Sequence, residues 1–142
     1  MGDKIDMKNA KMMGAYINSE REAVVESDDP HALVAVLFDE LLKSMHIFFQ
    51  NLDKKQANLE SRSKHLSRSL SLIYALQKSL DFEKGGDLAL NLYRLYEYSR
   101  LKIIDSSKTG AAEDLEVAIK SLEEISGAWR NVSPSKVSNM SI

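Results

Sequence analysis

The sequence predicts an all-α protein, an antiparallel four-helix bundle with a short extra N-terminal helix. Apolar residues recur at spacings of three and four along most of the chain, which places them on one face of a helix. Strand-like alternation is almost absent, and the two prolines, Pro30 and Pro134, both lie at expected boundaries. Because short polar segments separate the helices, consecutive long helices should run antiparallel.

The first long helix is expected over residues 30–52. Asp29 can accept hydrogen bonds from the first free N–H groups, and Pro30 supplies a preset φ at the first helical position. Its apolar stripe comprises Val34, Leu37, Leu41, Met45, Phe48 and Leu52. After a polar segment at 53–61, a second stripe predicts a helix that the glycine pair at 85–86 ends. This second stripe comprises Leu66, Leu70, Ile73, Leu76 and Leu80.

Two further helices are expected over residues 87–105 and 111–130, with a turn at 106–110. Asp87 can cap the first of them. The second carries an apolar stripe in which we expect Trp129 to pack as a structural residue. This stripe comprises Leu115, Ala118, Leu122, Ile125 and Trp129.

The chain is expected to form one domain over residues 1–130, followed by a flexible tail at 131–142 rich in serine and asparagine. Within this domain the N-terminal segment, residues 1–28, is expected to be mobile. A short, weakly amphipathic helix is predicted in it from apolar residues at helical spacing. These residues are Met13, Tyr16, Ile17 and Val24.

Composition excludes several classes of function. Apolar residues make up 44% of the 142, enough for one core, and the net charge of −2 gives no general attraction to nucleic acid or anionic membranes. The absence of cysteine excludes disulfides and thiol catalysis. No apolar run approaches the roughly 18 residues that span a bilayer, and the N-terminus has no apolar signal-peptide core. We therefore expect a soluble, cytoplasmic protein that does not insert into membranes.

No catalytic or metal-binding pattern is present, so we expect neither an enzyme nor a bound metal or cofactor. His31, His46 and His65 are widely separated, and none forms the Glu-x-x-His pair typical of metal sites in helical bundles. They are expected at the surface or at helix edges. A group of basic residues is interpreted as a solvated face, because no aromatic residues alternate with it as nucleic-acid binding would require. This group comprises Arg62, Lys64, His65 and Arg68.

The helix at 87–105 is more apolar than the surface of a simple bundle requires. Plotted at about 100° per residue, its apolar residues cover an arc about twice as wide as one core-facing stripe. Leu88, Leu92 and Leu95 lie on the stripe that a bundle would bury. Two explanations remain open: the helix is central and covered on both sides, which is favoured in a small bundle, or part of it is offered to a partner helix.

The far part of this arc contains candidate partner-binding residues. Leu90, Tyr93 and Leu101 extend the apolar face well beyond the core-facing stripe. Asn91 and Tyr98 lie next to each other on the opposite, polar side, where they could supply hydrogen bonds at the edge of a groove or simply be exposed.

Three stretches of the sequence follow a family pattern. The first is a leading Tyr16 followed by Asp-Pro-x-x-Leu-Val-x-Val-Leu-Phe-Asp over 29–39. The second, over 80–98, contains Leu-Asp, Gly-Gly, Ala-x-Asn-Leu and Leu-Tyr-x-Tyr in that order, and the third pairs Glu116-Val117 with Ala128-Trp129. In order and spacing, these stretches resemble the FliS family of flagellin export chaperones across most of the chain.

The sequence departs from this family pattern at three places. Glu40 stands where the family commonly has glycine, Val36 replaces a methionine, and Ser106-Ser107 replaces an Ala-Asn pair. These differences leave the expected fold unchanged and bear on the choice of partner.

The resemblance implies a cytoplasmic chaperone that binds the disordered C-terminal segment of flagellin, prevents premature polymerisation and assists delivery to the flagellar type III export apparatus. Contacts with export-gate or regulatory proteins are a further expectation, and the flagellin complex is expected to be one-to-one. The N-terminal piece that carries Tyr16 is expected to lie over a groove. The candidate partner-binding residues are Met13, Tyr16, Ile17, Val34, Phe38, Leu90, Asn91, Tyr93, Tyr98 and Leu101. The alternative is a generic helical adaptor or scaffold that acts through a homodimer interface.

Overall fold

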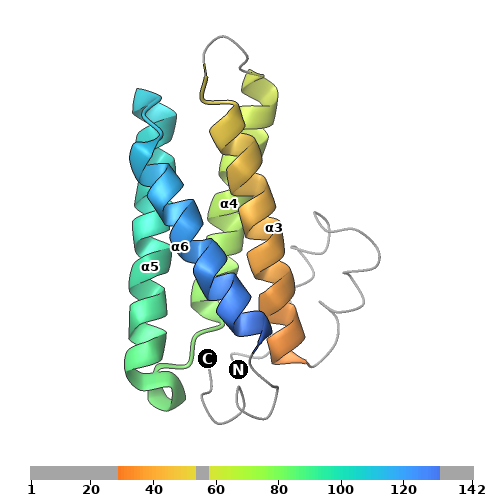
Figure 1. Cartoon of the computed structure of the whole chain (residues 1–142), viewed down its shortest axis with the longest axis vertical. Helices are drawn as coiled ribbons and strands as arrows, with labels where there is room; N and C mark the ends of the chain where they lie inside the picture. The colour runs from red at the N-terminus through yellow and green to blue at the C-terminus, as the bar shows by residue number, and fades with distance from the viewer. Residues whose placement is uncertain (1–28, 54–57, 132–142) are drawn as a thin grey trace.

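The computed structural model describes residues 29–53 and 58–131, which form an all-α bundle of four helices, as predicted. Successive helices run in opposite directions, and each packs against two others, with the last returning to the first (Figure 1). The expected N-terminal helix and nearly all of the C-terminal tail lie outside the described residues. The helices are α3 (Pro30–Gln50), α4 (Leu59–Lys78), α5 (Phe82–Thr109) and α6 (Glu113–Arg130).

The start of α3 follows the predicted capping chemistry. The Asp29 carboxylate accepts a hydrogen bond from the backbone N–H of Ala32 at 3.1 Å, and Pro30 occupies the first turn. The whole predicted apolar stripe of this helix is buried, with Leu41 at its centre. Since a fully buried leucine contributes about 1.5–3 kcal/mol, this stripe is a main source of stability for the bundle.

The boundary between α4 and α5 differs from the prediction. α4 ends at Lys78, before the glycine pair at 85–86. α5 begins at Phe82 because the Asp81 carboxylate accepts hydrogen bonds from two backbone N–H groups of the first turn, at 3.1 and 3.0 Å. The glycine pair therefore lies inside α5 and does not end α4.

Gly86 kinks α5 near its start, with φ 51° and ψ −127°. Asp87, the predicted cap, follows this kink within the helix. At its other end α5 continues through the predicted turn at 106–110 and stops at Gly110, whose left-handed φ of 76° lets its N–H donate to the Ser106 carbonyl oxygen at 2.8 Å.

All four helices contribute to one core. Trp129 of α6 is buried, as predicted, and so is Tyr96 of α5. Burial raises the pKa of the Tyr96 hydroxyl, because the charged form would lose its hydration. In the part of the chain that the structure describes, none of the helices combines the length and apolar character needed to span a bilayer.

Candidate partner-binding surface

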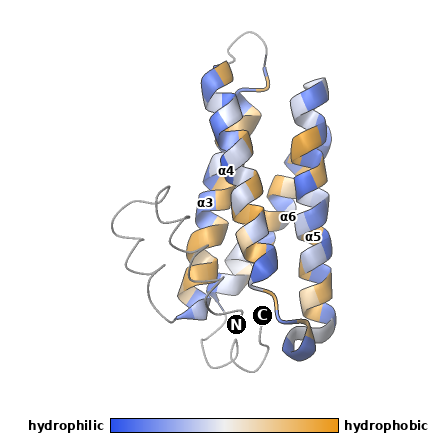
Figure 2. Ribbon diagram, turned by 180° about the vertical axis from the view of Figure 1, so that it is seen from behind, coloured by the Kyte–Doolittle hydropathy of each residue, from blue (hydrophilic) through white to orange (hydrophobic). Residues whose placement is uncertain are grey.

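Large exposed hydrophobic side chains are concentrated on α4 and α5. Among the described residues, seven of the eight such side chains lie on these two helices, and only Val117 lies elsewhere, on α6. Seen from behind, hydrophobic positions are spread along the length of α5 (Figure 2). Such a concentration on one side of a bundle is typical of an interaction surface. The seven are Leu59, Tyr74, Phe82, Leu88, Leu90, Tyr93 and Leu101.

The far part of the apolar arc on α5 is open. Leu90 and Tyr93 are each 38% exposed and Leu101 is 49% exposed. α5 packs mainly against α4 and α6, and these three side chains face away from the core. The favoured explanation for the arc, a central helix covered on both sides, is therefore wrong for this face.

A polar link between α4 and α5 fixes the relative level of the two helices. The Gln77 amide donates a hydrogen bond to the Glu97 carboxylate at 3.1 Å. Tyr74 lies about one turn before Gln77 in α4, and Leu101 lies about one turn after Glu97 in α5. Because the two helices are antiparallel, Tyr74 and Leu101 are therefore at the same level of the bundle. We call Tyr74, Leu90, Tyr93 and Leu101 the outer strip; its α5 part extends about 16 Å along the helix.

The carboxylate within this strip remains charged over a wide pH range. Hydrogen bonds from Arg100, at 2.9 Å, and from Gln77 lower the pKa of Glu97, which outweighs the opposing effect of partial burial. Glu97 therefore stays ionised beside the strip, where the Arg100 guanidinium on the same helix neutralises its charge.

Leu88 differs from the prediction, which placed it in the core with Leu92. Leu92 is 6% exposed as expected, whereas Leu88 is 36% exposed. Leu88 follows the kink at Gly86 by only two positions, whereas Leu92 lies one turn further into the straight part of α5.

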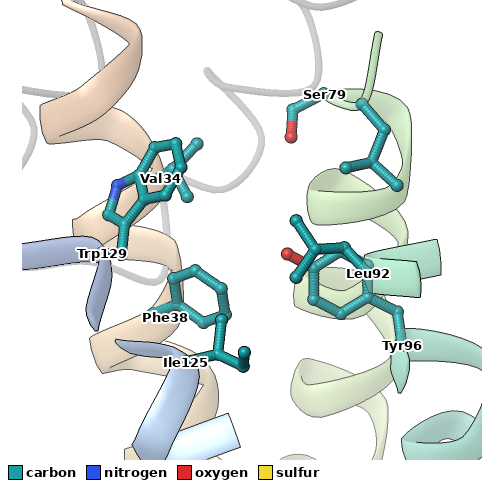
Figure 3. A pocket seen from close by; sticks show the side chains of 8 residues that line it. Val34, Phe38, Ser79, Leu92, Tyr96, Ile125 and Trp129 are labelled. Atoms are coloured by element: carbon teal, nitrogen blue, oxygen red, sulfur yellow. The ribbon is translucent and has the colours of Figure 1, made fainter. Parts of the chain in front are cut away.

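Val34 and Phe38, two of the predicted partner-binding residues, are buried in the bundle. They line a small apolar pocket of about 10 Å³ that is partly open to solvent. Their side chains face Leu92 and Tyr96 across this pocket (Figure 3). A partner could reach Val34 and Phe38 only through the pocket. Its lining comprises Val34, Phe38, Ser79, Leu80, Leu92, Tyr96, Ile125 and Trp129.

The predicted polar residues lie on the other flank of α5. Asn91 is exposed, and Tyr98 is half-buried with the Lys102 ammonium 5.4 Å from its ring centre. Lys102 also pairs with Asp114 of α6 at 3.3 Å, so this flank faces α6, whereas the outer strip lies on the α4 side. The structure thus places Leu90, Tyr93 and Leu101 together and separates them from Asn91 and Tyr98.

The group of basic residues is not the solvated face that was expected. Arg68 forms a largely buried ion pair with Glu40 of α3, and His65 is buried beside Ser44. Arg62 donates a hydrogen bond to the backbone carbonyl of Ser107, which leaves Lys64 as the exposed member. Three of the four side chains therefore join helices to one another.

The other two histidines also form contacts between helices. His31 pairs with Trp129, and His46, at the surface, lies 2.9 Å from the Glu123 carboxylate. Within residues 29–53 and 58–131, no cluster of three or more His, Cys, Asp or Glu side chains is placed to hold a metal ion.

Comparison with known families identifies the type of bundle. The family described as Flagellar protein FliS matches residues 12–136, which include all four helices. The chain belongs to the FliS family. FliS is a family of chaperones and not of enzymes.

Relatives within the FliS family cover most of the chain. The Flagellar secretion chaperone FliS of Salmonella typhimurium is 30% identical over 132 residues, covering 90% of this chain and 94% of the relative. FliSB of Pseudomonas aeruginosa, also a flagellar secretion chaperone, is 27% identical and covers 87% of this chain and 96% of its own length. The Flagellar secretion chaperone FliS of Vibrio cholerae is 25% identical, and the match covers 84% of this chain and 87% of the relative.

The FliS match also includes residues that the structure does not describe. Met13, Tyr16 and Ile17 fall within residues 12–136 but outside the described ranges, so their assignment to the partner-binding site rests on sequence alone. Phe82, by contrast, is exposed next to the outer strip, and sequence reasoning missed it because it was assigned to the end of the preceding helix.

Proposed function

We propose that this FliS-family protein is a cytoplasmic chaperone that binds the disordered C-terminal segment of flagellin, one-to-one. Binding would keep flagellin from polymerising before it reaches the flagellar type III export apparatus. The observation that carries the proposal is the exposed outer strip on α4 and α5. The relatives are described as flagellar secretion chaperones, which supports a role in flagellar secretion.

The physical requirements of such a cargo agree with this surface. A disordered segment loses conformational entropy when it becomes ordered on a partner, so the partner must supply a large apolar surface that is already formed. The outer strip lies on two rigid helices that the Gln77–Glu97 hydrogen bond joins. The strip therefore needs little rearrangement before it binds.

The spacing of the strip suits a helical cargo. Leu90, Tyr93 and Leu101 lie on one side of α5, and Tyr74 adds an aromatic ring from α4 at the level of Leu101. An amphipathic cargo helix could place side chains at every third or fourth position against this row. The C-terminal segment of flagellin would then gain helical structure as it binds.

Isothermal titration calorimetry tests the proposal directly. The full-length protein is titrated with the C-terminal segment of the flagellin made in the same cell, and a scrambled peptide of the same composition is the control. We expect saturable one-to-one binding, a negative heat-capacity change and increased helical circular dichroism of the mixture. Binding no stronger than that of the scrambled peptide would contradict the proposal.

Light scattering distinguishes the chaperone from a homodimeric adaptor. The same outer strip could pack against a second copy of the chain, which would make it unavailable to flagellin. A monomer that binds flagellin one-to-one agrees with the proposed function. A stable dimer that excludes the flagellin segment would instead favour the adaptor.

A further inference from the structure

Two exposed aromatic rings meet because α5 is kinked. The rings of Phe82 and Tyr93 lie edge to face, with centroids 5.9 Å apart. In a continuous helix, residues eleven positions apart are separated by about 16 Å along the axis, too far for two such rings to touch. The kink at Gly86 redirects the first turn of α5, visible as the hook at the base of that helix in Figure 1, and brings Phe82 to Tyr93.

The backbone of Gly86 is one that an L-residue cannot readily adopt. Reversing the signs of its φ of 51° and ψ of −127° gives the extended region that L-residues favour, so this conformation suits glycine or a D-residue. A Cβ added at Gly86 would meet no atom within 4 Å. The constraint on this position is therefore the backbone conformation and not the space around it.

The geometry points to Gly86 as a positioning residue for the partner-binding surface: it holds the exposed ring of Phe82 against Tyr93 so that the outer strip continues beyond the end of α4. This inference rests on the proposed function. Both rings are open to solvent, Phe82 at 49% and Tyr93 at 38% exposed, so the pair is available to a partner. Edge-to-face rings held in place before binding offer the cargo an apolar anchor with little entropy left to lose.

The chain provides a matched control for the backbone strain. Gly110 also has a positive φ, and an added Cβ there would likewise meet no atom within 4 Å, but it lies at the opposite end of α5. Gly86→Ala and Gly110→Ala should both strain a position of positive φ and destabilise the fold. Only Gly86→Ala should separate Phe82 from Tyr93.

The test combines affinity with a structural readout in the full-length protein. For Gly86→Ala we expect affinity for the flagellin C-terminal segment to fall about five- to tenfold, whereas Gly110→Ala should stay within about twofold of the wild type. Phe82→Ala should lower affinity to a similar extent, and adding Gly86→Ala to it should cause little further loss, because both act through the same ring.

Ring-to-ring nuclear Overhauser effects between Phe82 and Tyr93 should be present in the wild type and absent in Gly86→Ala. D-alanine at position 86, introduced by protein ligation, should restore both the contact and the affinity.

The outcomes separate this inference from the proposed function. A wild-type protein that binds flagellin no better than a scrambled segment overturns the proposed function, and this inference with it. Wild-type binding with unchanged affinity in Gly86→Ala overturns the inference alone. Additive losses in the double variant, or a ring contact that persists in Gly86→Ala, also overturn it.

Discussion

His31 and Trp129, 98 positions apart in the sequence, exchange two hydrogen bonds. The Trp129 indole N–H donates to the His31 carbonyl oxygen at 3.0 Å, and His31 Nε2 lies 2.8 Å from the Trp129 carbonyl oxygen. Because a carbonyl oxygen can only accept, Nε2 carries the proton. The two rings also stack, with centroids 5.2 Å apart. This pair joins the first turn of α3 to the last turn of α6 and closes one end of the bundle.

Removing the indole donor should weaken this closure. Trp129→Phe keeps an aromatic ring but leaves the His31 carbonyl without its donor, so we expect a loss of about 1–2 kcal/mol in the free energy of unfolding. Trp129→Ala also removes the buried ring and should cost about 3–5 kcal/mol. Urea denaturation measures both. A denaturation midpoint for Trp129→Ala equal to that of the wild type would show that the ring does not support the fold.

The ion pair between Glu40 and Arg68 is largely buried between α3 and α4. Glu40→Gln should destabilise the protein by up to about 3–5 kcal/mol, because the largely buried Arg68 guanidinium loses the negative charge of Glu40. Replacing both residues, as Glu40→Leu with Arg68→Met, should recover much of this loss.

An exposed pair provides the control for this experiment. Glu116 and Lys120 lie one turn apart on α6, and both are well exposed. Glu116→Gln should change the free energy of unfolding by less than about 1 kcal/mol. Equal effects of Glu40→Gln and Glu116→Gln in denaturant titrations would contradict a special role for the buried pair.

Stability should depend on the protonation of His65, which is buried between the same two helices. Burial, together with the positive charges of Arg68, Lys64 and Lys43, lowers the pKa of its imidazole below the usual 6.5. The unfolded chain therefore binds a proton at a higher pH than the folded protein does. The contribution of neutral His65 is fully present above about pH 6.5 and is lost as the pH falls towards the folded-state pKa.

Denaturation midpoints between about pH 7.5 and pH 5.5 check this dependence. The wild type should lose stability on acidification, and His65→Gln should flatten the curve over this interval. His46→Gln, which removes a surface histidine, should keep the slope of the wild type. An identical slope in His65→Gln and the wild type would exclude His65 as its source.

The parts of the fold that could be predicted are those with local signals. Asp29 and Pro30 are adjacent in the sequence and mark the start of α3. The spacing of the apolar residues of this helix identifies its buried face. The glycine pair at 85–86 lies inside α5 and does not end a helix as predicted, because a glycine permits either a helix stop or a kink. What distinguishes the two here is the Asp81 cap and the contact of Phe82 with Tyr93.

Long-range pairing explains the other differences. Nothing near Arg68 in the sequence shows that Glu40, 28 positions earlier, neutralises it. Leu88 is likewise 36% exposed although it shares the predicted stripe with buried Leu92, so a place in the stripe does not by itself determine burial. The candidate site was predictable to the extent that Leu90, Tyr93 and Leu101 share a side of one helix. Its contribution from α4, Tyr74, required knowledge of how the two helices align.

Lysine substitutions on α5 separate residues that support the fold from residues of the outer strip. Leu92 is buried in the core, so Leu92→Lys should place an unpaired charge there and unfold the protein. Leu90 and Leu101 are exposed, and Leu90→Lys and Leu101→Lys should leave the thermal midpoint near that of the wild type.

The same two strip variants should nevertheless bind cargo poorly. Each replaces one apolar anchor of the strip with a charge, which should weaken binding of the flagellin C-terminal segment by at least about 1–2 kcal/mol. Asn91→Lys, an exposed substitution on the α6 flank of the same helix, adds the same charge away from the strip and should retain affinity if the strip alone carries binding. Thermal melts and binding curves on the same preparations show whether each variant is folded and whether it still binds cargo.

Folded Leu90→Lys and Leu101→Lys variants that bind as tightly as the wild type would remove the outer strip from the binding site. The cargo surface would then have to lie at the pocket beside Val34 and Phe38, where a partner must reach between α3 and α5.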